Sequence, residues 1–258
     1  MIIESKKLFF NTVNIILEDN KIDELIKSHK YSKISAVSYK KMDLTGFDVW
    51  TKTTALILLN KDKDEIFSKF RDTTRNEVRR TYKNDDLKFI TDDKNFDESY
   101  SLYKEFEYIQ GRVPVSKKEL KHCKLFSANY KGKMVSAVYV TISFPYLRIR
   151  SIFSKRFEVD DKDLRKVISN ATRRIMWEIC LWGKENNFKS LDFASVNFKN
   201  PKTANITKFK MSFGGQVVNE YIYTYKSKLF KNFERFVFIK IWISRLINFI
   251  KSILKGRD

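Results

Sequence analysis

The sequence is poor in the residues that mark several common classes of protein. Among its 258 residues there are two cysteines, two histidines, three prolines and seven glycines. Cys123 and Cys180 are too few for a disulfide framework, and no Cys/His cluster has the spacing of metal ligands. We therefore expect a chain without a bound metal that folds in a reducing compartment. The scarcity of glycine and proline argues against long flexible segments.

Long hydrophobic runs are also missing. No stretch of 18 residues is free of charged side chains, so we expect no ordinary membrane-spanning helix. The segment 1–7 lacks the apolar region and the small-residue cleavage site of a signal peptide. These absences favour a cytoplasmic protein.

Acidic residues are few compared with basic ones. The chain has 31 Asp and Glu against 51 Lys and Arg, a formal net charge of +20. Such an excess favours anionic partners: RNA, phosphorylated lipid carriers, nucleotide donors or an acidic membrane face. Proteomes rich in Lys, Asn and Ile have a high basic content in general, so the charge supports an anionic partner without naming one.

Apolar residues make up 43% of the chain, enough for a sizeable core. Their periodicity from residue 54 onwards predicts the order β-α-β-α-β-β-β-α-β-α-β. We expect three parts: an N-terminal extension or truncated lobe, a main domain and a basic C-terminal helix, with boundaries at 1–50, 51–227 and 228–258. The expected strands cover 54–59, 87–90, 124–130, 134–144, 147–154 and 190–194, and the expected helices cover 96–109, 161–187 and 206–213, with one more beginning at 60–64.

The segment 190–218 is the most informative. A short strand, 190–194, follows a long helical segment, and a polar loop with Pro201 leads into an amphipathic helix, 206–213. Gly214 and Gly215 end that helix, because one residue after a helix commonly needs a positive φ.

These motifs resemble those of a known family. Asp192-Phe193, Lys208-Phe209-Lys210 and Phe213-Gly214-Gly215 look like the closing motifs of the Fem-type acyltransferases, which have the GCN5-related N-acetyltransferase (GNAT) fold. The strand 54–59 and the basic segment 74–80, T-R-N-E-V-R-R, resemble an earlier part of the same family. The resemblance runs from about 51 to 225. It implies an α/β (α+β) fold with a GNAT-like mixed central sheet, helices on both faces, and a splayed centre where donor and acceptor meet.

The resemblance also implies roles for individual residues. Lys210 would steady the charge that develops on the transferring carbonyl, and Asp192 would orient or deprotonate the attacking amine. An ordinary exposed lysine and a loop-pinning carboxylate are the alternatives. We expect further substrate-binding residues, for which core packing or a solvated basic surface is the alternative: Phe209, Lys208, Arg75, Arg79, Arg148, Arg150 and Asn197.

The segment before the long helix lacks glycine, and this absence suggests which acyl donor the protein uses. Ordinary GNAT enzymes bind the coenzyme A pyrophosphate with a glycine-rich loop, whereas 154–166 contains no glycine. The prediction is therefore an N-acyltransferase with no tightly bound cofactor that takes its acyl group from aminoacyl-tRNA. Its acceptor would be an amino group of a lipid- or nucleotide-linked cell-envelope precursor, either a peptidoglycan peptide or an amino sugar. The alternatives are an acyl-CoA-dependent enzyme of surface polysaccharide synthesis and a non-catalytic RNA- or glycolipid-binding module.

Two other features remain. The tail from 239 has an apolar arc opposite a cationic one, which is typical of a peripheral membrane helix but also of a helix docked on the protein or on a second subunit.

His122 beside Cys123 has no partner at a suitable spacing, so a turn histidine and a buried cysteine are expected.

Overall fold

The computed structural model of the protein describes residues 1–236, which form two compact units. The larger unit contains Met1 and Lys52–Glu220. The smaller unit contains Ile2–Thr51 and, of the described residues, 221–236. The sequence analysis had assigned 221–227 to the main domain, whereas the structure groups them with the N-terminal segment. The apolar arc predicted from residue 239 lies outside the described residues.

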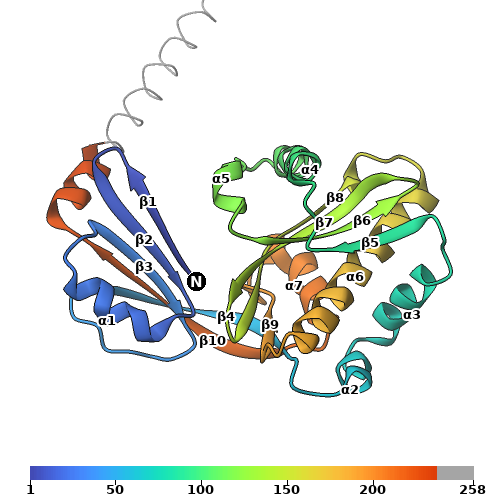
Figure 1. Cartoon of the computed structure of the whole chain (residues 1–258), viewed down its shortest axis with the longest axis horizontal. Helices are drawn as coiled ribbons and strands as arrows, with labels where there is room; N and C mark the ends of the chain where they lie inside the picture. The colour runs from blue at the N-terminus through green and yellow to red at the C-terminus, as the bar shows by residue number, and fades with distance from the viewer. Residues whose placement is uncertain (237–258) are drawn as a thin grey trace, which may run out of the picture. The chain divides into compact units, whose positions relative to one another are not determined.

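The larger unit is built on a mixed sheet (Figure 1). Its strand order is β4-β9-β8-β7-β6-β5, with the first half of β10 beside β4. Only the β8–β9 pair is parallel among the pairs whose register is defined within this unit. The strands are β4 (Asp48–Leu58), β5 (Leu87–Thr91), β6 (Lys124–Tyr130), β7 (Lys133–Ser143), β8 (Tyr146–Ser154), β9 (Ser190–Asp192) and β10 (Gln216–Lys226).

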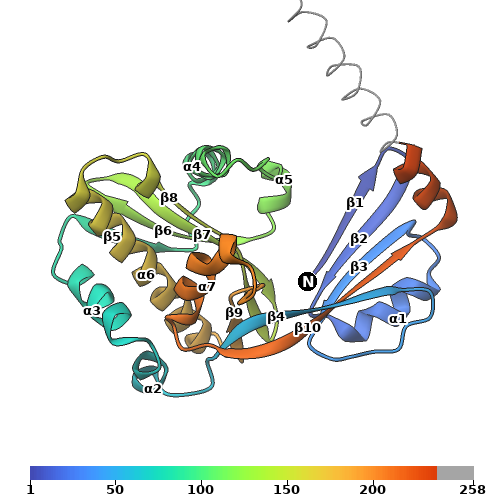
Figure 2. The ribbon, with the colours of Figure 1, turned by 180° about the vertical axis from the view of Figure 1, so that it is seen from behind.

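Helices cover both faces of this sheet (Figures 1 and 2). Side chains alternate between faces along a strand, and β7 shows the division. Val138 and Val140 pack in one cluster with α6, whereas Ala137 and Tyr139 pack in another with α4. The helices are α2 (Lys63–Ser68), α3 (Asp72–Thr81), α4 (Phe96–Ile109), α5 (Lys117–Leu120), α6 (Lys162–Glu185) and α7 (Ala204–Met211).

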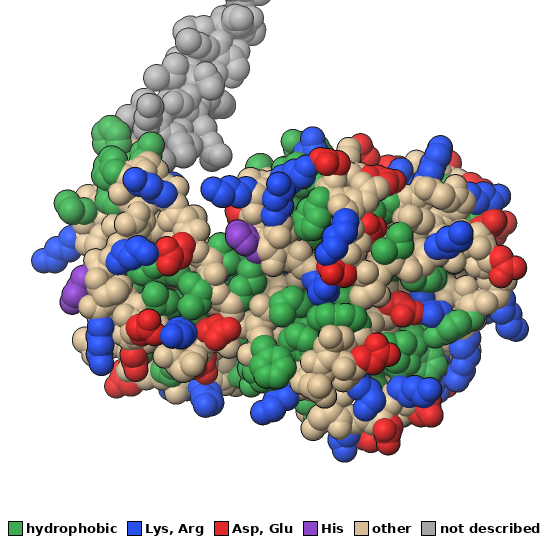
Figure 3. Space-filling model, in the orientation of Figure 1, with side chains coloured by type: hydrophobic (Ala, Val, Ile, Leu, Met, Phe, Trp, Pro, Cys, Tyr) green, Lys and Arg blue, Asp and Glu red, His purple; other side chains and the backbone are tan. Residues whose placement is uncertain are grey.

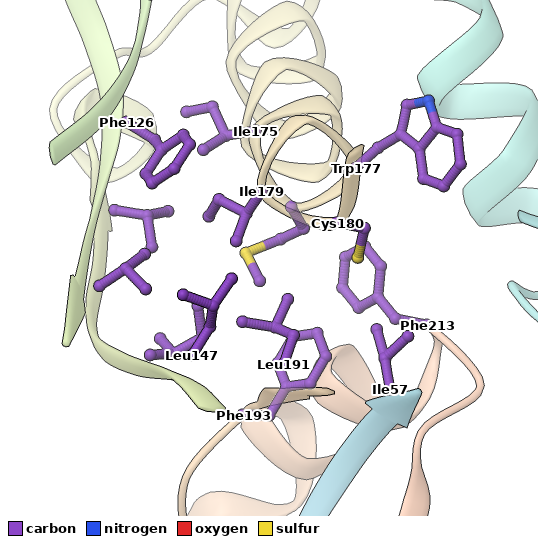
Figure 4. Packing of buried hydrophobic residues seen from close by; sticks show 14 of the residues in the cluster. Ile57, Phe126, Leu147, Ile175, Trp177, Ile179, Cys180, Leu191, Phe193 and Phe213 are labelled. Atoms are coloured by element: carbon purple, nitrogen blue, oxygen red, sulfur yellow. The ribbon is translucent and has the colours of Figure 1, made fainter. Parts of the chain in front are cut away.

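The long helix α6 forms the centre of the main core. Asp161 caps its start by accepting the backbone N–H groups of Asp163 (2.8 Å) and Leu164 (3.3 Å). Ile175 and Ile179 on its inner face are almost completely buried among side chains of the sheet (Figure 4). Burying each such side chain contributes about 1.5–3 kcal/mol, so this helix and the sheet stabilise each other.

The smaller unit has its own sheet and core. Its strand order is β1-β2-β3 followed by the second half of β10, and α1 (Asp19–Lys27) packs on β2 and β3. The segment from Lys228 is helical, and its Phe230 packs edge-on against Phe10 at 5.2 Å between ring centroids. The three N-terminal strands are β1 (Ile2–Lys7), β2 (Phe10–Ile16) and β3 (Lys33–Ser38).

The predicted fold class is confirmed: a mixed sheet with helices on both faces, in the expected order of elements. One prediction is wrong. The helical spacing of Ile66, Phe70, Thr74 and Val78 predicts one continuous helix after residue 60, with Arg71, Arg75 and Arg79 as a stripe along it. The structure instead has two helices, α2 and α3, so the three arginines do not form one stripe. Tertiary contacts explain the break, because the Arg71 N–H donates to Ser212 O at 2.9 Å. The strands β1 and β2 were not predicted.

No helix among residues 1–236 has the length and the apolar character needed to cross a membrane. Lys and Arg side chains are spread widely over the face of the larger unit that Figure 3 shows, with acidic side chains among them.

The turn after α7 generates a stability prediction. Gly214 has a φ of +70°, and a Cβ there would lie 2.2 Å from the backbone oxygen of Lys69. Gly132 has a φ of +79° and open space around it. Gly132→Ala should lower the free energy of unfolding by about 1–2 kcal/mol, because alanine is strained in a left-handed backbone conformation. Gly214→Ala should lose at least about 1–3 kcal/mol more, because a backbone atom must move.

Urea unfolding of both variants measures this difference. Equal losses in the two variants would show that the close approach of Gly214 to Lys69 is not a constraint on the fold.

Candidate active site

The sheet of the larger unit opens where β8 and β9 part. Their parallel pairing covers only three registers and ends at Arg148 and Asp192, although β8 continues to Ser154. Opposite Tyr139 and Val140 of β7, β8 has one extra residue, Arg150, which forms a β-bulge. The bulge reverses the side-chain alternation. Leu147 before it faces the α6 cluster, and Phe153 after it faces the α4 cluster.

A pocket of about 570 Å³ lies along this opening. Its walls come from β8 after the split, the loop after β9, α7, α4 and α6. Arg112, Arg150, Arg156, Arg173 and Lys210 contribute positive charge, and the only acidic side chain among the described lining residues is Glu107. The other walls are largely aromatic and aliphatic, including Phe106, Val113, Phe157, Phe193 and Ile206. An apolar pocket with a few convergent polar groups is typical of a ligand site.

Lys210 lies in the last turn of α7 and reaches this pocket. Its ammonium donates to the carbonyl oxygens of Ser195 (2.8 Å) and Ala194 (3.3 Å). A lysine ammonium has three N–H donors, so one is left for a ligand. Burial lowers the pKa of Lys210 to about 8, a shift that the nearby Asp192 opposes.

Asp192 lies behind the pocket wall and is fully buried. Its Oδ1 accepts from the Thr54 hydroxyl and from the Ala194 N–H (2.7 Å), and its Oδ2 accepts from Arg148. The predicted role of Asp192 in orienting or deprotonating a substrate amine stays a prediction. In this structure its N–H···O contact holds Ala194, whose φ is +55° and whose carbonyl accepts from Lys210.

Arg148 joins two buried carboxylates. It pairs with Asp192 through one guanidinium nitrogen and with Glu220 Oε2 through the other, at 2.7 Å. Asp192 and Glu220 are 0% and 1% exposed, so Arg148 compensates two buried negative charges. Arg148 therefore holds β8, β9 and β10 together beside the opening, and it does not line the pocket.

Aromatic packing fixes α7. Phe213 is fully buried and packs on Phe193 (Figure 4) at 5.2 Å between ring centroids. It also packs on Phe70 and Phe209, each at 5.2 Å. Phe209 is half-buried, lines the pocket and has the Arg173 guanidinium over its ring at 5.4 Å. The Phe-Gly-Gly motif thus anchors the helix that presents Lys210.

The remaining predicted site residues divide into two groups. Arg150 lines the pocket. Lys208 is exposed, and the Asn197 side chain accepts the N–H groups of Lys199 and Asn200 in its own loop.

Two arginines of α3 that were predicted to bind phosphate, Arg75 and Arg79, lie apart from the pocket lining. Arg75 donates to the carbonyls of Ser68 (2.6 Å) and Phe70 (2.7 Å), which closes the end of α2. Arg79 is exposed and lies over the Phe67 ring at 5.4 Å. Their predicted role in binding phosphate stays a prediction.

The sequence analysis missed Glu107. It lies near the end of α4, is 8% exposed, and its Oε1 accepts from Arg112 at 2.8 Å. Within residues 1–236 its Oε2 has no hydrogen-bond partner. In the sequence, Glu107 looks like an ordinary glutamate near the end of a helix. Nothing around it predicts that it lines a pocket.

The start of α6 is closed to a pyrophosphate. The Asp161 carboxylate already accepts the first free N–H groups of the helix, and Asp163 adds a second negative charge. A helix N-terminus attracts anions only where its N–H groups are free. Arg165 further fixes the preceding loop by donating to Val159 O at 2.7 Å.

The described residues include no group of metal-ligating side chains, and both cysteines are buried. No three His, Cys, Asp or Glu side chains in residues 1–236 are grouped to hold a metal ion. As predicted, His122 is exposed and Cys123 is buried, and burial raises the pKa of the Cys123 thiol.

No family model matches the sequence, and no match was found among curated proteins. Solved structures do match. FemX covers 86% of this chain and 83% of its own, with a TM-score of 0.62 and 11% identity. The C-terminal domain of a putative lysylphosphatidylglycerol synthetase from Agrobacterium fabrum has a TM-score of 0.54 at 12% identity, covering 86% and 80% of the two chains.

A third match is L-PGS from Bacillus licheniformis, with a TM-score of 0.52, 13% identity, and 88% and 81% of the chains covered. This chain has the fold of these proteins. The predicted resemblance to the Fem-type acyltransferases is thus confirmed at the level of the fold. In this Fem-like fold the parted strands, the pocket and Lys210 belong to one unit.

The buried ion network generates a second prediction. Arg148→Met should lose about 3–5 kcal/mol of stability, because it leaves two buried carboxylates without their cation. Arg150→Met, two residues away on the exposed bulge, should change stability by less than about 0.5 kcal/mol. Denaturant unfolding of the two variants is the measurement. Adding Asp192→Asn and Glu220→Gln to Arg148→Met should restore most of the loss, and a failure to do so would contradict the role given to Arg148.

Proposed function

We propose that this protein is an N-acyltransferase whose reaction takes place in the pocket between the parted strands β8 and β9. The observation that carries the proposal is Lys210. Its ammonium is held by two backbone carbonyls, has one N–H left for a ligand and lies in a pocket that excludes much of the solvent. A fixed cation in such surroundings stabilises an oxyanion far better than one in water.

The proposed reaction is direct transfer from an ester to an amine. The neutral amine attacks the acyl carbon, and the carbonyl oxygen becomes an oxyanion that Lys210 stabilises. The new C–N bond forms and the ester C–O bond breaks. The amine gives up a proton, and the departing hydroxyl oxygen takes one. Aligning the two reactants in one pocket supplies a further part of the rate enhancement.

Glu107 is proposed to hold the amine. It is the acidic group among the described residues that line the pocket, and its Oε2 is unoccupied by protein donors within residues 1–236. A carboxylate in this position accepts a hydrogen bond from an amine and orients its lone pair. Asp192 supports Lys210 from behind, through Ala194.

The donor proposed is an aminoacyl-tRNA. Three observations support it: a net charge of +20, arginines along the pocket and a helix start that Asp161 already caps. The similar structures include FemX and the C-terminal domain of a putative lysylphosphatidylglycerol synthetase, which supports transfer of an aminoacyl group. The proposed acceptor is an amino group of a cell-envelope precursor, either a peptide or an amino sugar, met at the cytoplasmic face of the membrane.

Lys210 yields a prediction on rate. Lys210→Ala should lower kcat by about 10²–10³, the usual effect of removing an oxyanion-stabilising donor. Lys202→Ala, at an exposed lysine just before the same helix and outside the pocket lining, should leave the rate unchanged. Steady-state kinetics of the two variants test the proposal, and equal rates in Lys210→Ala and the native protein would rule it out.

The pH dependence gives a separate prediction. Burial lowers the pKa of Lys210 to about 8, so the side chain is a cation below that pH and neutral above it. A reaction that needs the cation should therefore slow as the pH rises through about 8. Lys210→Arg, whose guanidinium stays charged, should keep its activity above that pH. A native rate that keeps rising through pH 9 to 10 would contradict the role of the cation.

Glu107 yields a prediction on binding of the acceptor. Glu107→Gln should raise the KM for the amine about 10- to 100-fold, the usual effect of losing a hydrogen bond to a charged group, with a smaller change in kcat. Glu105→Gln, on the exposed side of the same helix, is the matched control. A change in kcat alone, with the KM unaltered, would show that Glu107 does not hold the amine.

Mass spectrometry of candidate precursors identifies donor and acceptor together. The protein is incubated with charged tRNA or with acyl-CoA, and the mass added to a peptide or amino-sugar precursor is measured. We expect the mass of an aminoacyl group with charged tRNA. Transfer from acyl-CoA alone would instead assign the protein to coenzyme A-dependent acylation, and binding of RNA with no transfer at all would assign it to a binding module.

A further inference from the structure

A second pocket adjoins the first. It has a volume of about 310 Å³ and is lined by Glu77 of α3, by Arg156 of the turn after β8, and by the side of α6 between Lys162 and Arg173. Arg156, Ser169 and Arg173 line both pockets, so the two are neighbours that share a wall. Nothing in the proposed transfer reaction uses this second pocket.

The second pocket has an excess of positive charge. Five cationic side chains line it, against the single carboxylate of Glu77, which pairs with Arg173 Nε at 2.7 Å. Arg156, Lys162 and Lys166 form no ion pair with any residue in 1–236. Burial lowers the pKa of Arg173, the pair with Glu77 opposes this shift, and the neighbouring Arg156 adds to it. Such a group of cations favours a bound anion.

Asn170 supplies an independent observation. It is 7% exposed and lines the pocket, and its side-chain Oδ1 is buried without a hydrogen-bond partner in the described part of the chain. An unsatisfied buried carbonyl is unfavourable by about 1–3 kcal/mol. It is satisfied only by a donor, which an ionised phosphate lacks. A ligand that offers both an anion and a hydroxyl or N–H group would fit the cations and Asn170 together.

We infer that this pocket binds a ribose phosphate, with the phosphate on the lysines and arginines and a ribose hydroxyl donating to Asn170. The inference rests on the proposed function, because the shared wall would let the donor's acyl end occupy the first pocket while its ribose phosphate occupies the second. An RNA strand and a ribonucleotide coenzyme both carry this chemistry. Five cationic side chains are more than one phosphate group requires, and this favours the RNA strand.

Binding of a short fluorescent single-stranded RNA to the full chain tests the inference. Lys162→Glu/Lys166→Glu should weaken binding at least about tenfold and reduce the slope of log K against log salt by about 1.4, the value for two lost phosphate contacts. Lys118→Glu/Lys189→Glu makes the same change in net charge at exposed positions outside both pockets. This control should bind nearly as well as the native protein. Equal losses in the two double variants would overturn the inference.

Asn170→Ala tests the ribose hydroxyl. It should weaken binding of the RNA about tenfold and leave binding of DNA of the same sequence unchanged, because DNA lacks the 2′-hydroxyl. An equal effect on RNA and DNA, or none on either, would overturn the ribose assignment. The melting temperature of each variant, compared with that of the native protein, separates these effects from unfolding.

Two further measurements identify the source of the ribose phosphate and separate this inference from the proposed reaction. Adenosine 3′,5′-bisphosphate is titrated into the native protein and the Lys162→Glu/Lys166→Glu variant; binding that only the native protein shows, without RNA binding, would assign the site to a coenzyme. Turnover that needs Lys210, together with unchanged RNA binding in the second-pocket variants, would overturn the ribose-phosphate site alone. RNA binding that depends on the second pocket, without any turnover, would overturn the transferase alone.

Discussion

The point at which β8 and β9 part is the constraint on which the rest of the site depends. Arg148 lies there between the buried carboxylates of Asp192 and Glu220, and the parallel pairing of the two strands ends at this register. A buried ion pair gives little net stability, but it tolerates few other arrangements. The network therefore specifies where the sheet opens. The bulge at Arg150 then turns the free part of β8 toward the pocket.

The same network determines the electrostatics of the pocket. Asp192 is satisfied by protein groups and takes no part in the lining, yet through Ala194 it fixes a carbonyl that holds Lys210. The lysine is thereby kept in place at the pocket without a direct ion pair. Burial can then lower its pKa to about 8. A lysine in a direct ion pair would keep a high pKa. Its carboxylate partner would neutralise part of the positive charge that stabilises an oxyanion.

The helix α6 connects the core to both pockets. Its inner face carries Ile175 and Ile179 into the main core, and its start is closed by Asp161. Its N-terminal half presents lysines and arginines on another side, and Arg173 belongs to the walls of both pockets. A single rigid element thus sets the distance between the proposed reaction centre and the proposed ribose-phosphate site. Rigid elements position functional groups better than loops do.

Local pattern in the sequence determined most of the elements and pointed to one residue of the pocket. The helix Phe96–Ile109, the long helix α6 and the positive φ of Gly214 follow from periodicity and turn chemistry, and Lys210 follows from the motif around it. Contacts between distant segments decided the rest. Ser212 and Gly214 break the helix expected from residue 60 to Val78 by binding and crowding its middle. Folding buried Asp192 among protein donors, and it brought Glu107 to the wall that also carries Lys210. A sequence records which groups a chain has. Their desolvation, and their hydrogen-bond and ion-pair partners, exist only once the chain has folded.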